Sequence, residues 1–146
     1  MQSVQVSEYM NRHPVVFREN MAIEEAVELL LKTEQRGGPV IDDKKKVIGF
    51  LSEQDCLATM LRDTYHKEQT ATVGDCMFRG DVLTVKLDAA VMDLAQTMSA
   101  HKPKIYPVTD YQHKLVGIVS RTDILRALDM HLRDSYDQKT KKTKSR

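Results

Sequence analysis

The sequence lacks the short motifs that mark many nucleotide-using enzymes and hydrolases. It has no GxGxxG fingerprint and no GxxxxGK[ST] loop, so neither a Rossmann nor a P-loop nucleotide site is indicated. It has no GxSxG elbow, and nothing else in the pattern indicates nucleophilic catalysis. Its five histidines are scattered without HxxxH or HExxH spacing, which argues against a metal site. We therefore expect a protein that is not an enzyme.

Long apolar runs, excess charge and paired cysteines are also missing. No run approaches the roughly 18 apolar residues of a membrane span, and the first residues lack the features of a secretion signal, so we expect a cytoplasmic protein without a membrane partner. The net charge of +1 gives no general reason to expect nucleic acid. Cys56 and Cys76 form no CxxC pair and should stay reduced. Cys56 aligns with Ile124 in the repeat described next, which favours a buried apolar role.

What the sequence does contain is a tandem duplication. When residues 39–57 are aligned with residues 107–125, eight of the nineteen positions are identical, whereas roughly one would be expected by chance. The residues that recur 68 positions later are Pro39, Val40, Asp42, Lys46, Gly49, Ser52, Asp55 and Leu57. At 146 residues the chain is too short for two independent domains of usual size, so we expect the two repeats to share a core.

Hydrophobic patterns predict the same order of elements in each repeat. Short helices at residues 3–10 and 73–77 lead in, and short β-branched strands follow at residues 15–17 and 82–85. Apolar residues then recur at helical spacing: Ile23, Ala26, Val27 and Leu30 in one copy, and Val91, Leu94, Ala95 and Met98 in the other. Two strands joined by a polar turn come next, at residues 39–41 and 47–51, and at residues 105–109 and 115–119. Helices over residues 53–61 and 121–132 close the repeats.

The predicted unit is therefore β-α-β-β-α, twice, in the mixed α/β (α+β) class. We place repeat 1 at residues 6–61, a polar linker at residues 62–72 and repeat 2 at residues 73–132. Residues 133–146 form a basic tail that we expect to be disordered. We expect the helices of the two halves to pack against one another about a pseudo-two-fold axis.

The strand-to-helix junction of each repeat has the pattern Ser-x-x-Asp. A helix that starts just after a strand presents backbone N–H groups and the positive end of its dipole, which suits an anion. At the second junction Ser120 and Thr122 add hydroxyl donors, and Asp123 can accept hydrogen bonds from two ribose hydroxyls. The same pattern is also that of a capping box, in which serine and the acidic residue satisfy donors at the helix start. From the residues alone both interpretations stay open.

The duplicated unit, the Pro-Val-x-Asp before each turn and the Gly-h-h-Ser-x-x-Asp junction, where h is a hydrophobic residue, resemble a cystathionine β-synthase (CBS) domain pair, or Bateman module. The resemblance covers about residues 6–132. It implies a regulatory module that binds AMP, ADP, ATP, S-adenosylmethionine or, in some members, NAD or nucleic acid, and that usually forms disc-like homodimers.

The resemblance also implies two clefts between the repeats, in which the aspartate of one repeat holds the ribose and the first strand of the other borders the adenine. The residues so implied at the Asp123 cleft are Ser120, Thr122, Asp123, Lys104, His13, Pro14, Val15 and Val16. Those implied at the Asp55 cleft are Ser52, Asp55, Arg36, Gly37, Gly80, Asp81, Val82 and Leu83. Lys104 and Arg36 are cations that could meet phosphates, or solvated ends of a helix or turn.

The two clefts are not equivalent in the sequence. Glu53 puts a carboxylate beside the anion position of the first junction and Gln54 replaces Thr122, so we expect the Asp123 cleft to be the better nucleotide site. Gly37 and Gly38 should leave room for a base, whereas Tyr106 either stacks on a ligand or fills the cleft.

We therefore expect a stand-alone sensor that requires no cofactor, takes an adenine nucleotide or S-adenosylmethionine as ligand, forms a homodimer and signals to an effector protein. The alternatives are a dimerisation module whose Ser-x-x-Asp elements are only caps, and, less favoured, a nucleic-acid-binding regulator that uses the basic tail over residues 139–146.

Overall fold

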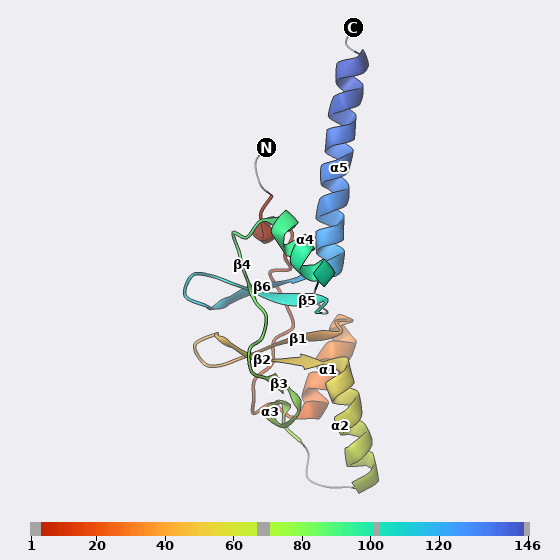
Figure 1. Ribbon diagram of the computed structural model, residues 1–146. Helices are drawn as coiled ribbons and strands as arrows, with labels where there is room; N and C mark the ends of the chain where they lie inside the picture. The colour runs from red at the N-terminus through yellow and green to blue at the C-terminus, as the bar shows by residue number, and fades with distance from the viewer. Residues whose placement is uncertain (1–3, 67–70, 101–102, 145–146) are drawn as a thin grey trace.

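Two three-stranded sheets, one for each repeat, form the centre of the fold (Figure 1). The computed structural model describes residues 4–66, 71–100 and 103–144. The elements of the first half are η1 (Val6–Glu8), α1 (Ile23–Thr33), β1 (Gly37–Ile41), β2 (Val47–Ser52) and α2 (Glu53–His66). Those of the second half are α3 (Val73–Cys76), β3 (Phe78–Arg79), β4 (Val85–Lys86), α4 (Val91–Ala100), β5 (Ile105–Thr109), β6 (Leu115–Ser120) and α5 (Arg121–Lys144).

The strand order confirms the predicted fold class. The sheets run β1-β2-β3 and β4-β5-β6, and each contains an antiparallel hairpin, β1–β2 or β5–β6. The first strand of each repeat is shorter than predicted. Residues 15–17 contribute one parallel bridge from Phe17 to Val40, and residues 82–85 contribute only the start of β4, which runs parallel to β5.

The hairpins have matching turns because an aspartate organises each one. Asp42 accepts hydrogen bonds from the N–H groups of Lys44 and Lys46, both at 2.9 Å. Asp110 accepts equivalent bonds from Gln112 and Lys114, at 2.8 and 3.0 Å. These contacts turn the chain as Asx turns do, and in each hairpin the pairing of the two strands shifts by a β-bulge next to the turn. The repeated Pro-Val-x-Asp pattern is therefore a hairpin signal.

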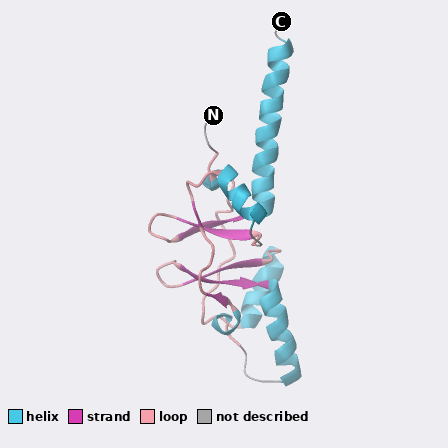
Figure 2. Cartoon of the chain, in the orientation of Figure 1, coloured by secondary structure: helices cyan, strands magenta, loops and turns pink. Residues whose placement is uncertain are grey.

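Two amphipathic helices cover the sheets, as the periodicity predicted. Ile23, Ala26 and Leu30 are buried on α1, and Val91, Leu94 and Met98 are buried on α4. The helices lie on one side of the strands, and the hairpin turns project on the other (Figure 2).

The lead-in segments of the two repeats are exchanged between the halves. Residues 4–11, which we call lead segment 1, pack on repeat 2: the N–H of Val6 donates to Ala89 at 2.9 Å, and Val6 is fully buried in the repeat-2 cluster. Residues 71–79, lead segment 2, pack on repeat 1: the N–H of Val73 donates to Met21 at 2.8 Å, and Val73 is fully buried there. This reciprocal exchange relates the halves by a pseudo-two-fold axis.

A glycine in each sheet allows the exchanged segment to cross. A Cβ atom on Gly117 would lie 2.6 Å from the carbonyl oxygen of Asn11 in lead segment 1. A Cβ atom on Gly49 would lie 2.7 Å from the carbonyl oxygen of Phe78 in lead segment 2. The crossings therefore need glycine, which explains why glycine occurs at this position in both repeats.

The expectation of one shared core is wrong. In the described part of the chain, buried hydrophobic residues form two clusters, one for each repeat, and each is completed by the lead segment of the other. The halves meet through β1 and β5 and through the hairpin turns, where the N–H of Leu115 donates to Lys45 at 2.9 Å. The predicted packing of helices between the halves is also wrong, because α1 packs mainly on α2 and α4 packs mainly on α5.

Two predicted irregular segments are largely ordered. The predicted linker is helical as far as His66, and Ala71 and Thr72 contact the start of α1; residues 67–70 lie outside the described residues. The predicted disordered tail is helical as far as Lys144, because α5 continues well beyond the rest of the fold (Figure 1). This continuation has no proline or glycine, and its lysines lie near the helix C-terminus, where positive charge is stabilising.

In the described part of the chain, no helix combines the length and the apolar character needed to cross a lipid bilayer.

Candidate functional site

The junction between β6 and α5 is a complete capping box. One carboxylate oxygen of Asp123, Oδ2, accepts from the N–H of Ser120 at 2.8 Å and from its hydroxyl at 2.9 Å. The N–H of Asp123 donates to Ser120 Oγ at 3.2 Å. The capping interpretation of the sequence is therefore confirmed at this junction.

The junction between β2 and α2 has the same geometry. Asp55 Oδ2 accepts from the N–H of Ser52 at 3.2 Å and from its hydroxyl at 2.8 Å, and the N–H of Asp55 donates to Ser52 Oγ at 3.2 Å. The capping role thus accounts for Ser52 and Asp55 as fully as for Ser120 and Asp123. Any ligand role must use the other carboxylate oxygen, Oδ1, of each aspartate.

The structure brings the predicted basic residue to each junction. The N–H of Arg121 donates to the carbonyl of Lys104 at 2.8 Å, and the N–H of Glu53 donates to the carbonyl of Arg36 at 2.9 Å. These bonds and the caps occupy most amides of the first helical turn. In the first turn of α2 the amide of Gln54, and in the first turn of α5 the amide of Thr122, is the only one without a partner among the described residues. Binding of an anion would therefore depend mainly on side chains.

The predicted adenine-side residues are only partly placed beside the junctions. Lead segment 1 pairs with β6, because Asn11 and Ile118 exchange hydrogen bonds of 2.7 and 3.0 Å, and His13 follows this bridge with an exposed side chain. Val15 is 7% exposed and belongs to the repeat-1 cluster, where its N–H donates to Gln35. Pro14, Val16 and Val82 are half-buried. The ligand contacts of these residues stay predictions.

The space expected beside Gly37 and Gly38 is filled. A Cβ atom on Gly37 would lie 2.8 Å from the ring of Phe50, and one on Gly38 would lie 2.6 Å from the carbonyl oxygen of Val15. The prediction that these glycines leave room for a base is therefore wrong, and Phe50 is the residue that the sequence interpretation overlooked.

Tyr106 occupies the position in repeat 2 that corresponds to Gly38. It is 2% exposed and packs in the repeat-2 cluster, so it fills the core. Burial raises the pKa of its hydroxyl, and this hydroxyl has no hydrogen-bond partner among the described residues. Leu83, which corresponds to the buried Val15, is 48% exposed. The two repeats therefore differ in the side chains that flank the predicted clefts.

Charge distinguishes the junctions further. Arg126 lies one helical turn after Asp123, and its Nη1 is 3.4 Å from Asp123 Oδ1. The matching residue after Asp55 is Ala58, and Glu53 replaces Arg121. The Asp123 junction thus has three cationic residues, Lys104, Arg121 and Arg126, of which Arg126 contacts the carboxylate. Arg126 was missed in the sequence interpretation, although its spacing of three residues from Asp123 on a helix signals such a contact.

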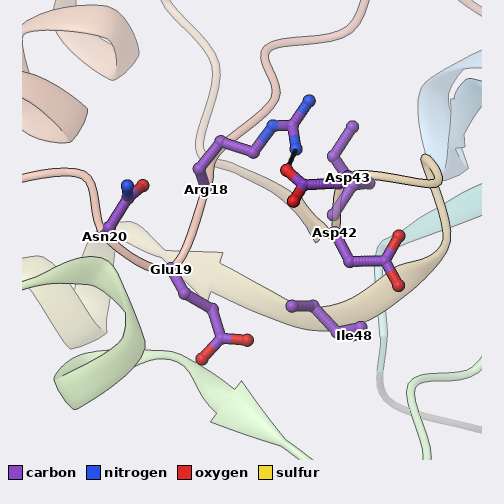
Figure 3. A pocket seen from close by; sticks show the side chains of 7 residues that line it. Arg18, Glu19, Asn20, Asp42, Asp43 and Ile48 are labelled. Atoms are coloured by element: carbon purple, nitrogen blue, oxygen red, sulfur yellow. Dashed lines mark hydrogen bonds and ion pairs between the residues drawn. The ribbon is translucent and has the colours of Figure 1, made fainter.

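A shallow cavity of about 430 Å³ lies at the other end of the β1–β2 hairpin (Figure 3). Its lining residues are Arg18, Glu19, Asn20, Ile41, Asp42, Asp43 and Ile48. Its carboxylates already have partners: Asp43 pairs with Arg18 at 3.0 Å, Glu19 pairs with Arg79 at 2.9 Å, and Asp42 caps the turn. No candidate metal cluster of His, Cys, Asp or Glu occurs in the part of the chain that the structure describes.

Curated relatives cover most of this chain but are longer. Uncharacterized protein MJ0188 of Methanocaldococcus jannaschii is 30% identical over 126 residues, which are 86% of this chain and 44% of the relative. Uncharacterized protein MJ1225 of the same organism is 28% identical over 123 residues, which are 84% of this chain and 42% of the relative. The chain thus spans less than half the length of these two relatives.

Similar solved structures include two complexes with adenosyl compounds. CBSX2 from Arabidopsis thaliana in complex with AMP is 28% identical, with a TM-score of 0.74, and the match covers 86% of this chain and 96% of that one. The CBS domain pair of protein MJ0100, in complex with 5′-methylthioadenosine and S-adenosyl-L-methionine, is 25% identical, with a TM-score of 0.75 and coverage of 89% and 99%.

The CBS domain family matches residues 6–62 and 73–130, one match for each repeat. These ranges contain both strand-to-helix junctions and both hairpins. This chain therefore belongs to the CBS domain family and carries a pair of CBS domains.

Proposed function

We propose that this chain is a regulatory module that binds an adenine nucleotide, or a related adenosyl compound such as S-adenosylmethionine, at the Asp123 junction. The observation that carries the proposal is the likeness to two CBS pairs that are each in complex with adenosyl compounds and match over nearly their whole length. The duplicated Ser-x-x-Asp junctions supply the corresponding chemistry. The proposed ligand-binding residues are Ser120, Thr122, Asp123 and Lys104, with His13 to Val16 on the adenine side.

The geometry of the Asp123 junction supports this choice. Oδ1 of Asp123 is not used by the cap, so it is available to accept hydrogen bonds from ribose hydroxyls once the exposed Arg126 side chain moves. The hydroxyl of Thr122 is exposed beside the unpaired amide of the same residue. Lys104 and Arg121 are exposed cations that can reach a phosphate. The Asp55 junction lacks two of these features, because it has Gln54 and Glu53 instead.

The output of binding is a shift between two arrangements of the halves. Because the halves meet at β1, β5 and the hairpin turns and have separate cores, their relative tilt can change without breaking either core. A ligand held between them shifts this equilibrium by its difference in affinity for the two arrangements. The module has no catalytic step of its own in this proposal and acts on an effector protein.

A second copy of the chain is the proposed partner in assembly. Large apolar side chains are exposed on α2 and α5, and Leu57 (63%) and Leu125 (66%) occupy equivalent places in the two repeats. We propose that these exposed apolar residues form the interface with the second copy. Substitution of both Leu57 and Leu125 by Lys should convert a dimer to a monomer in sedimentation velocity. A wild-type protein that sediments as a monomer at micromolar concentration would contradict the dimer.

The ligand proposal is tested by a thermal-shift panel of AMP, ADP, ATP, NAD, S-adenosylmethionine and cyclic dinucleotides. A ligand at 100 times its dissociation constant adds about 2.7 kcal/mol to stability, which a melting curve detects. We expect AMP or another adenosyl compound to raise the melting temperature of the wild type but not of Asp123→Asn. If no compound shifts the wild type, the chain is better explained as a dimerisation module whose Ser-x-x-Asp elements are only caps.

A further inference from the structure

Arg126 occupies the part of Asp123 that a ribose would need. The N–H and the hydroxyl of Ser120 both donate to Asp123 Oδ2. The other carboxylate oxygen, Oδ1, lies 3.4 Å from the guanidinium of Arg126. The side chain of Asp123 is 20% exposed and that of Arg126 is 60% exposed. A ligand that binds Oδ1 therefore competes with this guanidinium.

The other junction is open in the same place. Asp55 Oδ2 is held by Ser52 as Asp123 Oδ2 is held by Ser120, but Ala58 stands where Arg126 would be. In the described part of the chain, no cation is paired with Asp55. A ribose at Asp55 would therefore compete with no cation paired to this carboxylate among the described residues.

Displacement has different consequences for different ligands. The Arg126–Asp123 pair is an exposed ion pair, and such pairs are weak enough to be exchanged. A nucleoside that takes its place leaves the guanidinium without an anion. A nucleotide offers a phosphate instead, and arginine binds phosphate with two parallel hydrogen bonds. The exchange therefore favours a ligand that carries both a ribose diol and an anionic group.

The surrounding charges act in the same direction. Lys104 and Arg121 add positive charge beside Asp123, whereas the Asp55 junction has one cation, Arg36, against the carboxylates of Glu53 and Asp55. Since among the described residues only one amide in the first turn of α2 and of α5 lacks a partner, the side chains decide which charge a ligand can carry there. Charges closer together than the Debye length, about 8 Å at physiological salt, are only partly screened from one another.

We propose that Arg126 makes the Asp123 junction selective for phosphate-bearing adenosyl compounds, whereas the Asp55 junction, with Ala58 and Glu53 at the matching places, takes uncharged or cationic ones. This inference rests on the proposed function, because it assumes that the aspartates hold a ribose. It assigns Arg126 as a specificity-determining residue and gives the two halves of one module different ligand classes.

The experiment compares AMP with adenosine by calorimetric titration. The Asp123 junction is measured in an Asp55→Asn background, with Arg126 intact and as Arg126→Ala. We expect the intact junction to prefer AMP about tenfold or more, and we expect Arg126→Ala to reduce that preference to about twofold, because AMP loses a charge-assisted contact while adenosine no longer competes with the guanidinium. The matched gain-of-function variant is Ala58→Arg, measured in an Asp123→Asn background. This variant should give the Asp55 junction a preference for AMP over adenosine.

The possible outcomes separate the two proposals. If AMP binds and needs Asp123, but Arg126→Ala leaves the ratio of AMP to adenosine affinity unchanged, the role of Arg126 is overturned and the proposed function stands. The same conclusion follows if Arg126→Ala weakens both ligands in parallel, as a purely structural contact would. If neither AMP nor adenosine binds any of these proteins, both proposals are overturned.

Discussion

Substitution of Val6 by alanine should weaken the second CBS domain, although Val6 is the first residue of the first one in the chain. Val6 is fully buried in the repeat-2 cluster, where it packs with residues such as Val91 and Val108. The change removes two buried carbon atoms at about 0.8 kcal/mol each, and the cavity left behind increases the cost. We expect the free energy of unfolding to fall by between about 1.5 and 3 kcal/mol.

The assay is urea unfolding followed by circular dichroism, together with native-state hydrogen exchange. The exchange data should show that β5 and β6 lose more protection than β1 and β2, since locally opened regions report their own stability. Val73→Ala is the matched control, because Val73 is fully buried in the repeat-1 cluster and should give the opposite pattern. If Val6→Ala lowers the free energy of unfolding by less than about 0.5 kcal/mol, or if faster hydrogen exchange is confined to repeat 1, lead segment 1 does not complete the repeat-2 core.

Three further predictions follow from local geometry. Gly117→Ala should cost about 1–3 kcal/mol of unfolding free energy in urea, because its Cβ would lie 2.6 Å from the Asn11 carbonyl oxygen; a cost near zero would contradict the close crossing. Hydrogen bonds from backbone N–H groups, chiefly that of the last turn residue, lower the pKa of Asp42 and of Asp110. The two carboxylates therefore stabilise the fold above their unfolded pKa near 3.9, and this stabilisation is lost as pH falls through the folded pKa. In urea melts at a series of pH values, the double variant Asp42→Asn with Asp110→Asn should lose less unfolding free energy than the wild type below about pH 4. An unchanged dependence on pH would argue against this role of the two carboxylates. Burial is the main cause, and the nearby Cys76 thiol the second, that raises the pKa of the Cys56 thiol to about 11. In a Cys76→Ser protein at pH 8, the Cys56 thiol of the folded protein should react with an aromatic disulfide reagent about a hundredfold more slowly than the same thiol in urea. Equal rates would contradict the burial of Cys56.

The order of elements could be predicted from the sequence because it depends on local patterns. The stripe of Ile23, Ala26 and Leu30 and the repeated hairpin turns are short-range signals, and the structure confirms them. The duplication gave a second, independent copy of each signal. The capping box was also predictable, since its residues lie within four positions of one another.

Long-range packing could not be predicted in the same way. Nothing in the local pattern of Val6 says that it packs on repeat 2, because the exchange depends on how two distant segments cross at Gly117 and Gly49. The space beside Gly37 was misjudged for the same reason, since Phe50 fills it from the neighbouring strand. The helical course of α5 beyond residue 132 was missed because a run of charge was taken as a sign of disorder, although helix formers continue through it.

The most direct test of the central claim is a calorimetric titration of AMP into the wild type, Asp123→Asn and Asp55→Asn. Asparagine keeps an acceptor for the N–H and hydroxyl of its serine, so each substitution removes the charge while retaining most of the cap. The account predicts saturable binding to the wild type, binding to Asp55→Asn with similar affinity, and a loss of about tenfold or more in Asp123→Asn. Equal AMP affinity in the wild type and Asp123→Asn would contradict a nucleotide site at the Asp123 junction.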